Sequence, residues 1–249
     1  HDFEVLILKN ILVLHSSNNL KKMKKFILTS CVALIFAFQS QAQESLQKHY
    51  QAYYKQMLQQ GDVQGVINAL THLNVLNPSQ ERRDTLALVY SNNNQHIQAL
   101  NLTGIEVNPQ DSDLALQVKA ISLKALNQPG RAVPHFQIMF DRGPNPYVAY
   151  ELADLKIQAG DSPGALSDIE YGITNATDEM KYAFYERQQP YEVPLKAAFV
   201  HLKGLAQYNI DKNNIDQAIA SFDEALKIAP NFNLASLSKQ ALESRKETE

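Results

Sequence analysis

The sequence repeats one layout at a fixed interval of 33 residues, and this interval constrains the fold more than any other feature. In four consecutive segments, a Gly or Asn stands five positions before a small or β-branched apolar residue, which we call the anchor. The four anchors are Val66, Ala99, Ala132 and Ala165. A fifth anchor, Ala218, follows Ala165 after 53 residues, which is one interval plus 20. Self-similarity at a period of about 20 to 50 residues indicates an array of stacked structural units.

Each unit is predicted to consist of two helices joined by a short turn. Apolar residues at helical spacing precede each turn and follow each anchor, as Phe136 and Met139 do after Ala132. Proline cannot continue a helix interior, so it marks the ends of units. Four units end in this way, at Pro78, Pro109, Pro144 and Pro230.

Small residues explain how the two helices of a unit can pack together. Two helices approach to roughly 8–10 Å only where the side chains at their crossing are small. The first helices supply Ala87, Ala120, Ala153 and Ala206, which are expected to face the anchors of the second helices. Larger residues then fill the space between neighbouring units, because one unit cannot bury its own apolar face.

The fifth copy carries the full pattern: Leu205, Ala206, Asn213, Ile215, Ala218, Phe222, Ala225, Leu226 and Pro230. In this pattern the sequence resembles the tetratricopeptide repeat (TPR) family over about residues 47–230. The resemblance implies an all-α fold, a right-handed α-solenoid of about five helix-turn-helix repeats plus a C-terminal capping helix. The repeats are expected at about residues 47–78, 80–109, 113–144, 146–177 and 195–230, with a cap at 232–243 and a charged tail at 244–249.

The segment 23–42 predicts a secretory signal peptide. Lys24 and Lys25 form a basic start, an apolar run follows at 26–38, and Ser40 and Ala42 supply small residues before a cleavage site after Ala42. The 13-residue run is shorter than the roughly 20 residues of a membrane-spanning helix. Residues 1–22, which precede the first Met, are expected to be an upstream extension that is not native.

Cleavage would leave residues 43–243 as an exported solenoid, in the periplasm or associated with the envelope of a bacterium, with no transmembrane span. Lipidation at Cys31 is disfavoured, because only three apolar residues of the run precede this Cys. Loss of residues 1–42 removes five Lys, two acidic residues and the single Cys, and changes the net charge from -3 to -6. Stability would then depend on packing without disulfides.

Most of the 20 additional residues lie before the fifth copy, in an insert at 178–194. Its first part is predicted to be a helix, and its second part, which contains Pro190 and Pro194, is predicted to be extended. The insert carries Tyr182, Tyr185 and Tyr191. These rings would either anchor a partner or fill the space where the regular stack is offset, and the packing interpretation is the favoured one.

Catalytic, cofactor-binding and metal-binding residues are not expected. The sequence lacks a phosphate-binding loop and a zinc-hydrolase motif, and His49, His72, His96, His135 and His201 are too scattered for a local metal site. Asp111, Ser112 and Asp113 precede an apolar run and predict a helix N-cap. The mixed charge, without a basic stripe, gives no indication of nucleic-acid binding.

The TPR resemblance implies that the first helices line a groove that accepts a protein or peptide. The residues placed there are Gln51, Lys55, Asp84, Leu88, Asn92, Gln117, Lys124, Tyr150, Asp154, Gln158, Lys203 and Gln207. Some relatives clamp a C-terminal carboxylate with basic residues, but Gln51 and Leu114 occupy two such positions here. The clamp is therefore not expected.

Three functional hypotheses follow. The leading one is an exported scaffold or adaptor for protein–protein or protein–peptide interaction in the cell envelope. The second is an accessory domain or subunit of a cell-wall-acting enzyme, for which Glu151 and Asp154 on one predicted helix face give weak support. The third is a structural spacer in an envelope assembly.

The predicted crossing of small residues can be tested with Ala132→Tyr. The larger ring would overpack the contact between the two helices of the third unit and lower the free energy of unfolding by roughly 1–3 kcal/mol. A thermal unfolding experiment measures the effect, and an unchanged midpoint would contradict the assigned register.

Overall fold

The computed structural model describes residues 41–246. The upstream extension, the apolar run of the predicted signal peptide, Cys31 and the last three residues of the tail lie outside the described residues. The chain divides into two compact units, with the boundary between Ser79 and Gln80, and each unit is described by itself.

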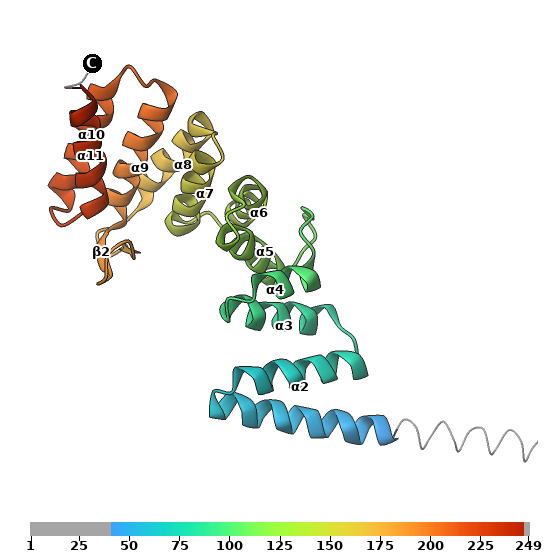
Figure 1. Cartoon of the computed structure of the whole chain (residues 1–249). Coiled ribbons are helices and arrows are strands. Elements are labelled where there is room, and N and C mark those ends of the chain that lie inside the picture. The colour runs from blue at the N-terminus through green and yellow to red at the C-terminus, as the bar shows by residue number, and fades with distance from the viewer. Residues whose placement is uncertain (1–40, 247–249) are drawn as a thin grey trace, which may run out of the picture. The chain divides into compact units, whose positions relative to one another are not determined.

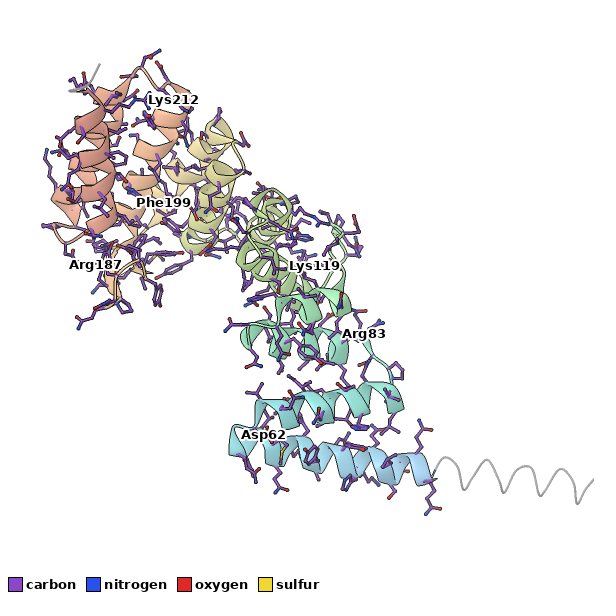
Figure 2. All side chains as sticks on the ribbon, in the orientation of Figure 1. Asp62, Arg83, Lys119, Arg187, Phe199 and Lys212 are labelled. Atoms are coloured by element: carbon purple, nitrogen blue, oxygen red, sulfur yellow. The ribbon has the colours of Figure 1, made fainter. Side chains whose placement is uncertain are left out.

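The first unit contains a helix at 41–60 and helix α2 (Val63–Leu76). Asp62 lies at the turn between them (Figure 2), where its carboxylate accepts a hydrogen bond from the backbone N–H of Gly65 and caps α2. Met57, Val66 and Leu70 are buried between the two helices. The first repeat therefore has the expected helix-turn-helix layout.

The second unit contains the remaining repeats as consecutive helix pairs (Figure 1). The pairs are α3 (Gln80–Asn92) with α4 (His96–Thr103), α5 (Asp113–Ala125) with α6 (Pro129–Arg142), α7 (Pro146–Gln158) with α8 (Ser162–Asn175), and α9 (Leu195–Ile210) with α10 (Ile215–Ile228). A terminal helix, α11 (Asn233–Lys246), packs on α10 as the expected cap. Each helix packs mainly against its neighbours in sequence, which confirms the predicted helical solenoid.

The Gly or Asn five positions before each of the first four anchors has a left-handed backbone conformation. The φ angles are 68° at Gly61, 58° at Asn94, 55° at Asn127 and 87° at Gly160. In each case the following residue donates its N–H to the carbonyl five positions earlier, as Asp161 does to Lys156 at 2.8 Å. This bond and the left-handed residue form the Schellman motif that ends a helix. The turn explains why Gly or Asn recurs there.

The predicted small-residue crossing is confirmed in α3/α4, α5/α6 and α7/α8, where the two Ala residues of each pair belong to one core cluster. Four anchors, Ala99, Ala132, Ala165 and Ala218, are fully buried, and Val66 is 4% exposed. The four first-helix residues Ala87, Ala120, Ala153 and Ala206 are also fully buried. Ala120 and Ala132 belong to one core cluster with Phe136, Leu123 and Leu152.

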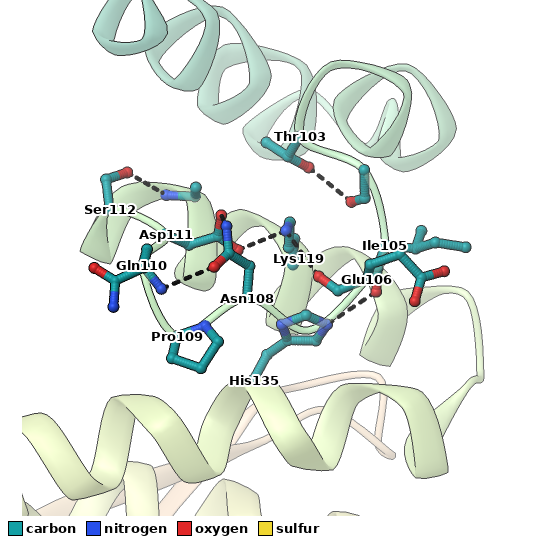
Figure 3. Close-up of polar contacts among 12 residues, drawn as sticks. Thr103, Ile105, Glu106, Asn108, Pro109, Gln110, Asp111, Ser112, Lys119 and His135 are labelled. Atoms are coloured by element: carbon teal, nitrogen blue, oxygen red, sulfur yellow. Dashed lines mark hydrogen bonds and ion pairs between the residues drawn. The ribbon is translucent and has the colours of Figure 1, made fainter.

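A polar loop at 104–112 replaces the end of the second repeat, because α4 ends after eight residues at Thr103. Figure 3 shows side chains of α5 and α6 that hold this loop. Lys119 is 3% exposed and donates to the Asp111 carboxylate at 2.5 Å and to the Glu106 carbonyl at 3.0 Å. The ring Nε2 of His135 lies 3.2 Å from the Ile105 carbonyl oxygen. Ser112 caps α5, as predicted.

The predicted helix in the first part of the insert is wrong. Residues 181–184 form strand β1 (Lys181–Phe184), which pairs antiparallel with β2 (Tyr191–Pro194) in register Lys181↔Pro194. Aromatic residues favour strands, and the alternation of Tyr182 and Phe184 with Lys181 and Ala183 suits a hairpin with one buried face. The second part is extended, as predicted.

The hairpin packs against both neighbouring repeats and the cap. Phe184 is 8% exposed, and its ring lies 4.9 Å from the ring of Phe232, which precedes α11. The Tyr191 hydroxyl donates to Glu186 at 2.6 Å and accepts the N–H of Leu234 at 3.4 Å. Burial would raise the pKa of Glu186, but the hydrogen bonds from Tyr191 and from Asn233 lower it. The hairpin thus fixes the start of the capping helix.

The helical cap extends beyond its expected end at 243, into the segment expected to be a tail. Lys246 forms an ion pair with Asp216 of α10 at 2.6 Å, and Arg245 donates to the Tyr208 hydroxyl at 2.6 Å. These contacts hold the last turn of α11 on the fifth repeat.

The left-handed turn predicts opposite effects for two Gly→Ala substitutions. At Gly160, φ is 87° and an added Cβ would contact nothing, so Gly160→Ala should lower the unfolding free energy by about 1 kcal/mol through backbone strain alone. Gly130 lies in the first turn of α6, where an added Cβ also contacts nothing. Gly130→Ala should raise the unfolding free energy by about 0.5 kcal/mol. Urea denaturation measures both, and equal effects would contradict the turn assignment.

The hairpin predicts unequal effects for two Tyr→Ala substitutions. The Tyr182 ring packs 4.2 Å from the Tyr150 ring and 5.2 Å from the Phe184 ring, whereas Tyr185 is 75% exposed. Tyr182→Ala should therefore lower the unfolding free energy by about 2–4 kcal/mol. Tyr185→Ala should change it by less than about 0.5 kcal/mol. Thermal unfolding of the full chain distinguishes the two, and a large loss for Tyr185→Ala would refute this assignment.

Candidate partner-binding site

Two surfaces of the second unit present groups suited to binding. The first is a tyrosine–acid cluster, formed by Lys124 of α5, Tyr150, Glu151 and Asp154 of α7, and Tyr182 of β1. The second is a cleft between α8 and α9, closed at one side by Gln217 of α10. Both surfaces lie in the part of the solenoid where the insert interrupts the repeat.

Glu151 is the fully partnered acid of the cluster. One of its carboxylate oxygens forms an ion pair with the Lys124 ammonium. The other accepts a hydrogen bond from the Tyr182 hydroxyl at 2.8 Å. Burial, together with the negative charge of Glu151, raises the pKa of Tyr182, so this hydroxyl stays protonated and remains a donor.

Asp154 is the second acid, and it has no ion-pair partner within the described residues. Its carboxylate accepts one hydrogen bond, from Gln158 one helical turn away at 2.7 Å. Partial burial raises the pKa of Asp154, against the opposing effects of the Gln158 bond and the more distant Lys124 charge. Asp154 therefore carries a carboxylate whose charge is incompletely compensated.

Tyr150 precedes Asp154 by one helical turn and lies on the same face of α7. The residue is 4% exposed, and its ring packs against Tyr182 and, at 5.5 Å, against Phe199. Figure 2 labels Phe199 on α9. Burial raises the pKa of Tyr150, and the nearby Asp154 carboxylate raises it further. No hydrogen bond to the Tyr150 hydroxyl is formed within the described part of the chain.

The cleft has a volume of about 660 Å³, which lies within the range typical of ligand pockets. Its apolar residues are Leu166, Ile169 and Ile173 of α8 and Ile210 at the end of α9. Its polar residues are Glu170, Thr174, Lys203, Gln207, Asp211 and Gln217. Leu166 is 37% exposed and Ile210 is 48% exposed, so the cleft offers apolar surface that the protein itself leaves uncovered.

The predicted groove residues are distributed over several environments. Gln51 and Lys55 are exposed on the helix at 41–60 of the first unit. In the second unit, Asn92, Gln117 and Gln158 are exposed, whereas Leu88, Lys124, Asp154, Lys203 and Gln207 are partly buried. Lys124, Tyr150 and Asp154 are brought together in the tyrosine–acid cluster, and Gln158 donates a hydrogen bond to Asp154. Lys203 and Gln207 are brought together in the cleft.

Two of the predicted groove residues are buried rather than presented to solvent. Asp84 is 2% exposed and accepts hydrogen bonds from Gln80 at 2.7 Å and from Ser112 at 2.6 Å. It therefore links α3 to the start of α5. Tyr150 is buried because the β-hairpin, which the sequence did not predict, covers its ring with Tyr182.

The apolar residues of the cleft were not among the predicted site residues. Leu166 and Ile173 belong to the second helix of the fourth repeat, whereas the family resemblance placed the binding residues on first helices. Their spacing with Ile169 follows one helical face and could have indicated an apolar stripe. Such a stripe, however, has the same pattern as a packed core.

No group of three or more His, Cys, Asp or Glu side chains in residues 41–246 is placed to hold a metal ion. None of the helices in the described part of the chain is long and apolar enough to cross a membrane.

Known structures resemble the fold, although no protein-family profile and no curated protein matches the sequence. The structure is similar to YrrB, described as a TPR protein with an unusual peptide-binding site, with a TM-score of 0.60 and 15% identity over 77% of this chain and 90% of that chain. It is also similar to the MamA protein, with a TM-score of 0.55 and 16% identity over 73% of this chain and 90% of that chain. The repeat layout, the helix pairs and these similarities together show that the chain has the tetratricopeptide repeat fold.

Proposed function

We propose that the protein is a scaffold that binds a segment of another protein through the cleft between α8 and α9. The observation that carries this proposal is the uncovered apolar surface of Leu166 and Ile210 inside a cleft of about 660 Å³. An apolar centre with a polar rim is the arrangement by which interfaces anchor one or two side chains of a partner.

The polar rim supports a peptide segment as the class of ligand. Glu170, Lys203 and Gln217 provide an acceptor, a cation and an amide at the edge of the apolar surface. Backbone N–H and C=O groups of a bound segment require such partners when they leave water. The description of YrrB as a TPR protein with a peptide-binding site agrees with this choice for the same fold.

We also propose that this binding takes place in the cell envelope after export. The support is the sequence of residues 23–42, where two Lys, an apolar run and small residues follow one another. Secretion of a reporter enzyme fused after Ala42 would test this proposal, with Lys24→Glu/Lys25→Glu as the control. A reporter retained in the cytoplasm by the unchanged sequence would refute the export proposal without affecting the binding proposal.

A carboxylate introduced into the cleft should abolish peptide binding. Peptides selected by display against the full chain would be measured by calorimetry with the wild type, Leu166→Glu and Ile210→Glu. Both substitutions should weaken binding at least about tenfold, because a charge in the apolar centre must be desolvated.

Leu237→Glu provides the matched control, since Leu237 is 51% exposed on α11 and does not line the cleft. It should bind the selected peptides as the wild type does. Unchanged affinity of Leu166→Glu and Ile210→Glu, or a selection that enriches no peptide, would contradict the proposed function.

A further inference from the structure

The β-hairpin has two outer edges, and the hydrogen bonds between its strands show which backbone groups each edge presents. The Leu195 N–H donates to the Met180 carbonyl at 2.8 Å, which fixes the phase of the antiparallel ladder. Because bonded and non-bonded pairs alternate along such a ladder, the backbone groups of Lys181 and Ala183 point away from β2. Each of these residues therefore presents one N–H and one C=O group at the outer edge of β1.

The outer edge of β2 is protected by its neighbours and by its sequence. Glu192 lies opposite Ala183 in the register, so its backbone groups also point outward, and its carbonyl accepts a hydrogen bond from the Asn231 side chain at 3.4 Å. Pro194, the next outward residue of β2, has no N–H. Soluble proteins prevent unwanted strand pairing by covering edges or placing proline on them.

The outer edge of β1 lacks this protection. Within residues 41–246, β1 pairs only with β2, and no hydrogen bond from the rest of the described chain reaches the backbone groups of Lys181 or Ala183. The hairpin projects from the start of α9 (Figure 1). Ala183 is partly exposed, and its methyl side chain leaves room for a second backbone to approach. A row of unpaired backbone groups is a template for another strand.

The side chains of β1 indicate the chemistry of a strand that fits this edge. Tyr182 is partly exposed on the face that packs against α7, with its ring 4.2 Å from the Tyr150 ring. A residue opposite Tyr182 in an added antiparallel strand belongs to a non-bonded pair, where side chains are closest, so a β-branched or aromatic residue suits that position. Lys181 is exposed on the other face without an ion-pair partner in the described part of the chain, so an acidic residue suits the position opposite it.

We propose that the outer edge of β1 binds an extended segment of a partner protein as a third, antiparallel strand. The segment carries a β-branched or aromatic residue opposite Tyr182 and an acidic residue opposite Lys181. Its backbone exchanges hydrogen bonds with Lys181 and Ala183, so the main chain supplies affinity and the two side chains supply selectivity. This strand site is separate from the cleft between α8 and α9 and goes beyond the binding proposed there.

Backbone N-methylation of a probe peptide tests the strand pairing itself. The probe is acetylated and amidated Val-Thr-Ile-Glu-Val, which places Thr opposite Ala183, Ile opposite Tyr182 and Glu opposite Lys181. Methyl groups on the Thr and Glu nitrogens remove the donors that face β1 and should weaken binding at least about tenfold. A methyl group on the Ile nitrogen, which faces away from β1, should leave binding unchanged. NMR titration of the 15N-labelled full chain measures each affinity, and the amide signals of Lys181 and Ala183 should shift.

Two proline variants form a matched pair, because Ala183 and Glu192 lie opposite each other in the hairpin. Ala183→Pro removes a donor from the outer edge of β1 and should weaken binding of the probe at least about tenfold. Glu192→Pro removes a donor from the outer edge of β2 and should bind as the wild type does. Lys181→Glu should weaken binding of the probe and strengthen binding of the peptide in which Lys replaces Glu. Thermal unfolding verifies that the variants are folded, and the methylated peptides test the wild-type chain if Ala183→Pro is not.

Absence of binding by the unmodified peptide, or equal binding by the two methylated forms, would overturn the inference. Loss of binding in Leu166→Glu would also overturn it, because the probe would then occupy the cleft. A chain that sediments as a dimer, and as a monomer after Ala183→Pro, would make a second copy the occupant of the edge. Binding that survives Leu166→Glu but not methylation of Thr and Glu supports the strand site whether or not peptides bind the cleft, so the two proposals fail separately.

Discussion

In the pairs α3/α4, α5/α6 and α7/α8, the two helices approach each other closely at two small side chains, one from each helix. Ala120 and Ala132 are fully buried in one core cluster, as are Ala153 and Ala165 in the next. A larger side chain at such a crossing would separate the helices, and close packing would pass that displacement to the neighbouring repeat. The left-handed turn residue five positions earlier determines which face of the second helix meets the first. Successive helix crossings of this kind are therefore 33 residues apart in the sequence.

Where the repeat is interrupted, specific polar and aromatic contacts replace the regular packing. In the loop at 104–112, the buried ammonium of Lys119 satisfies both a carboxylate and a backbone carbonyl (Figure 3). In the hairpin, burial and the bond to Glu186 raise the pKa of Tyr191 to about 12, so its hydroxyl remains protonated while it bridges to α11. Such contacts must be complete, because a partly satisfied buried network costs more than an apolar core. Both interruptions are therefore ordered parts of the fold.

The spacing of small residues and turn residues was sufficient to predict the helix pairs, because the same pattern of turn residue and anchor occurs in five copies. The hairpin was not predictable in the same way, since the insert occurs once and its Tyr and Phe residues suit a helix or a strand. The burial of individual groove residues was not predictable, because the period indicates the helix face on which a residue lies but not how deeply it is buried. Asp84 and Tyr150 were both expected to line the groove, but tertiary partners that are distant in sequence bury them.

The buried polar groups of the second unit differ in how well they are satisfied. Asp84 has two hydrogen bonds, and Asp168 forms an ion pair with Lys156 at 2.7 Å. His135 and His201 each leave Nδ1 without a partner among the described residues. Burial lowers the pKa of both, to about 4 for His201, so each ring is neutral and the cost is that of one unpaired neutral nitrogen. Asp154 is different, because its partly buried carboxyl group accepts one hydrogen bond, from Gln158, and has no ion-pair partner within the described residues. Desolvating a charge costs far more than desolvating a neutral acceptor. Burial therefore raises the pKa of Asp154, and the hydrogen bond from Gln158 offsets only part of that effect.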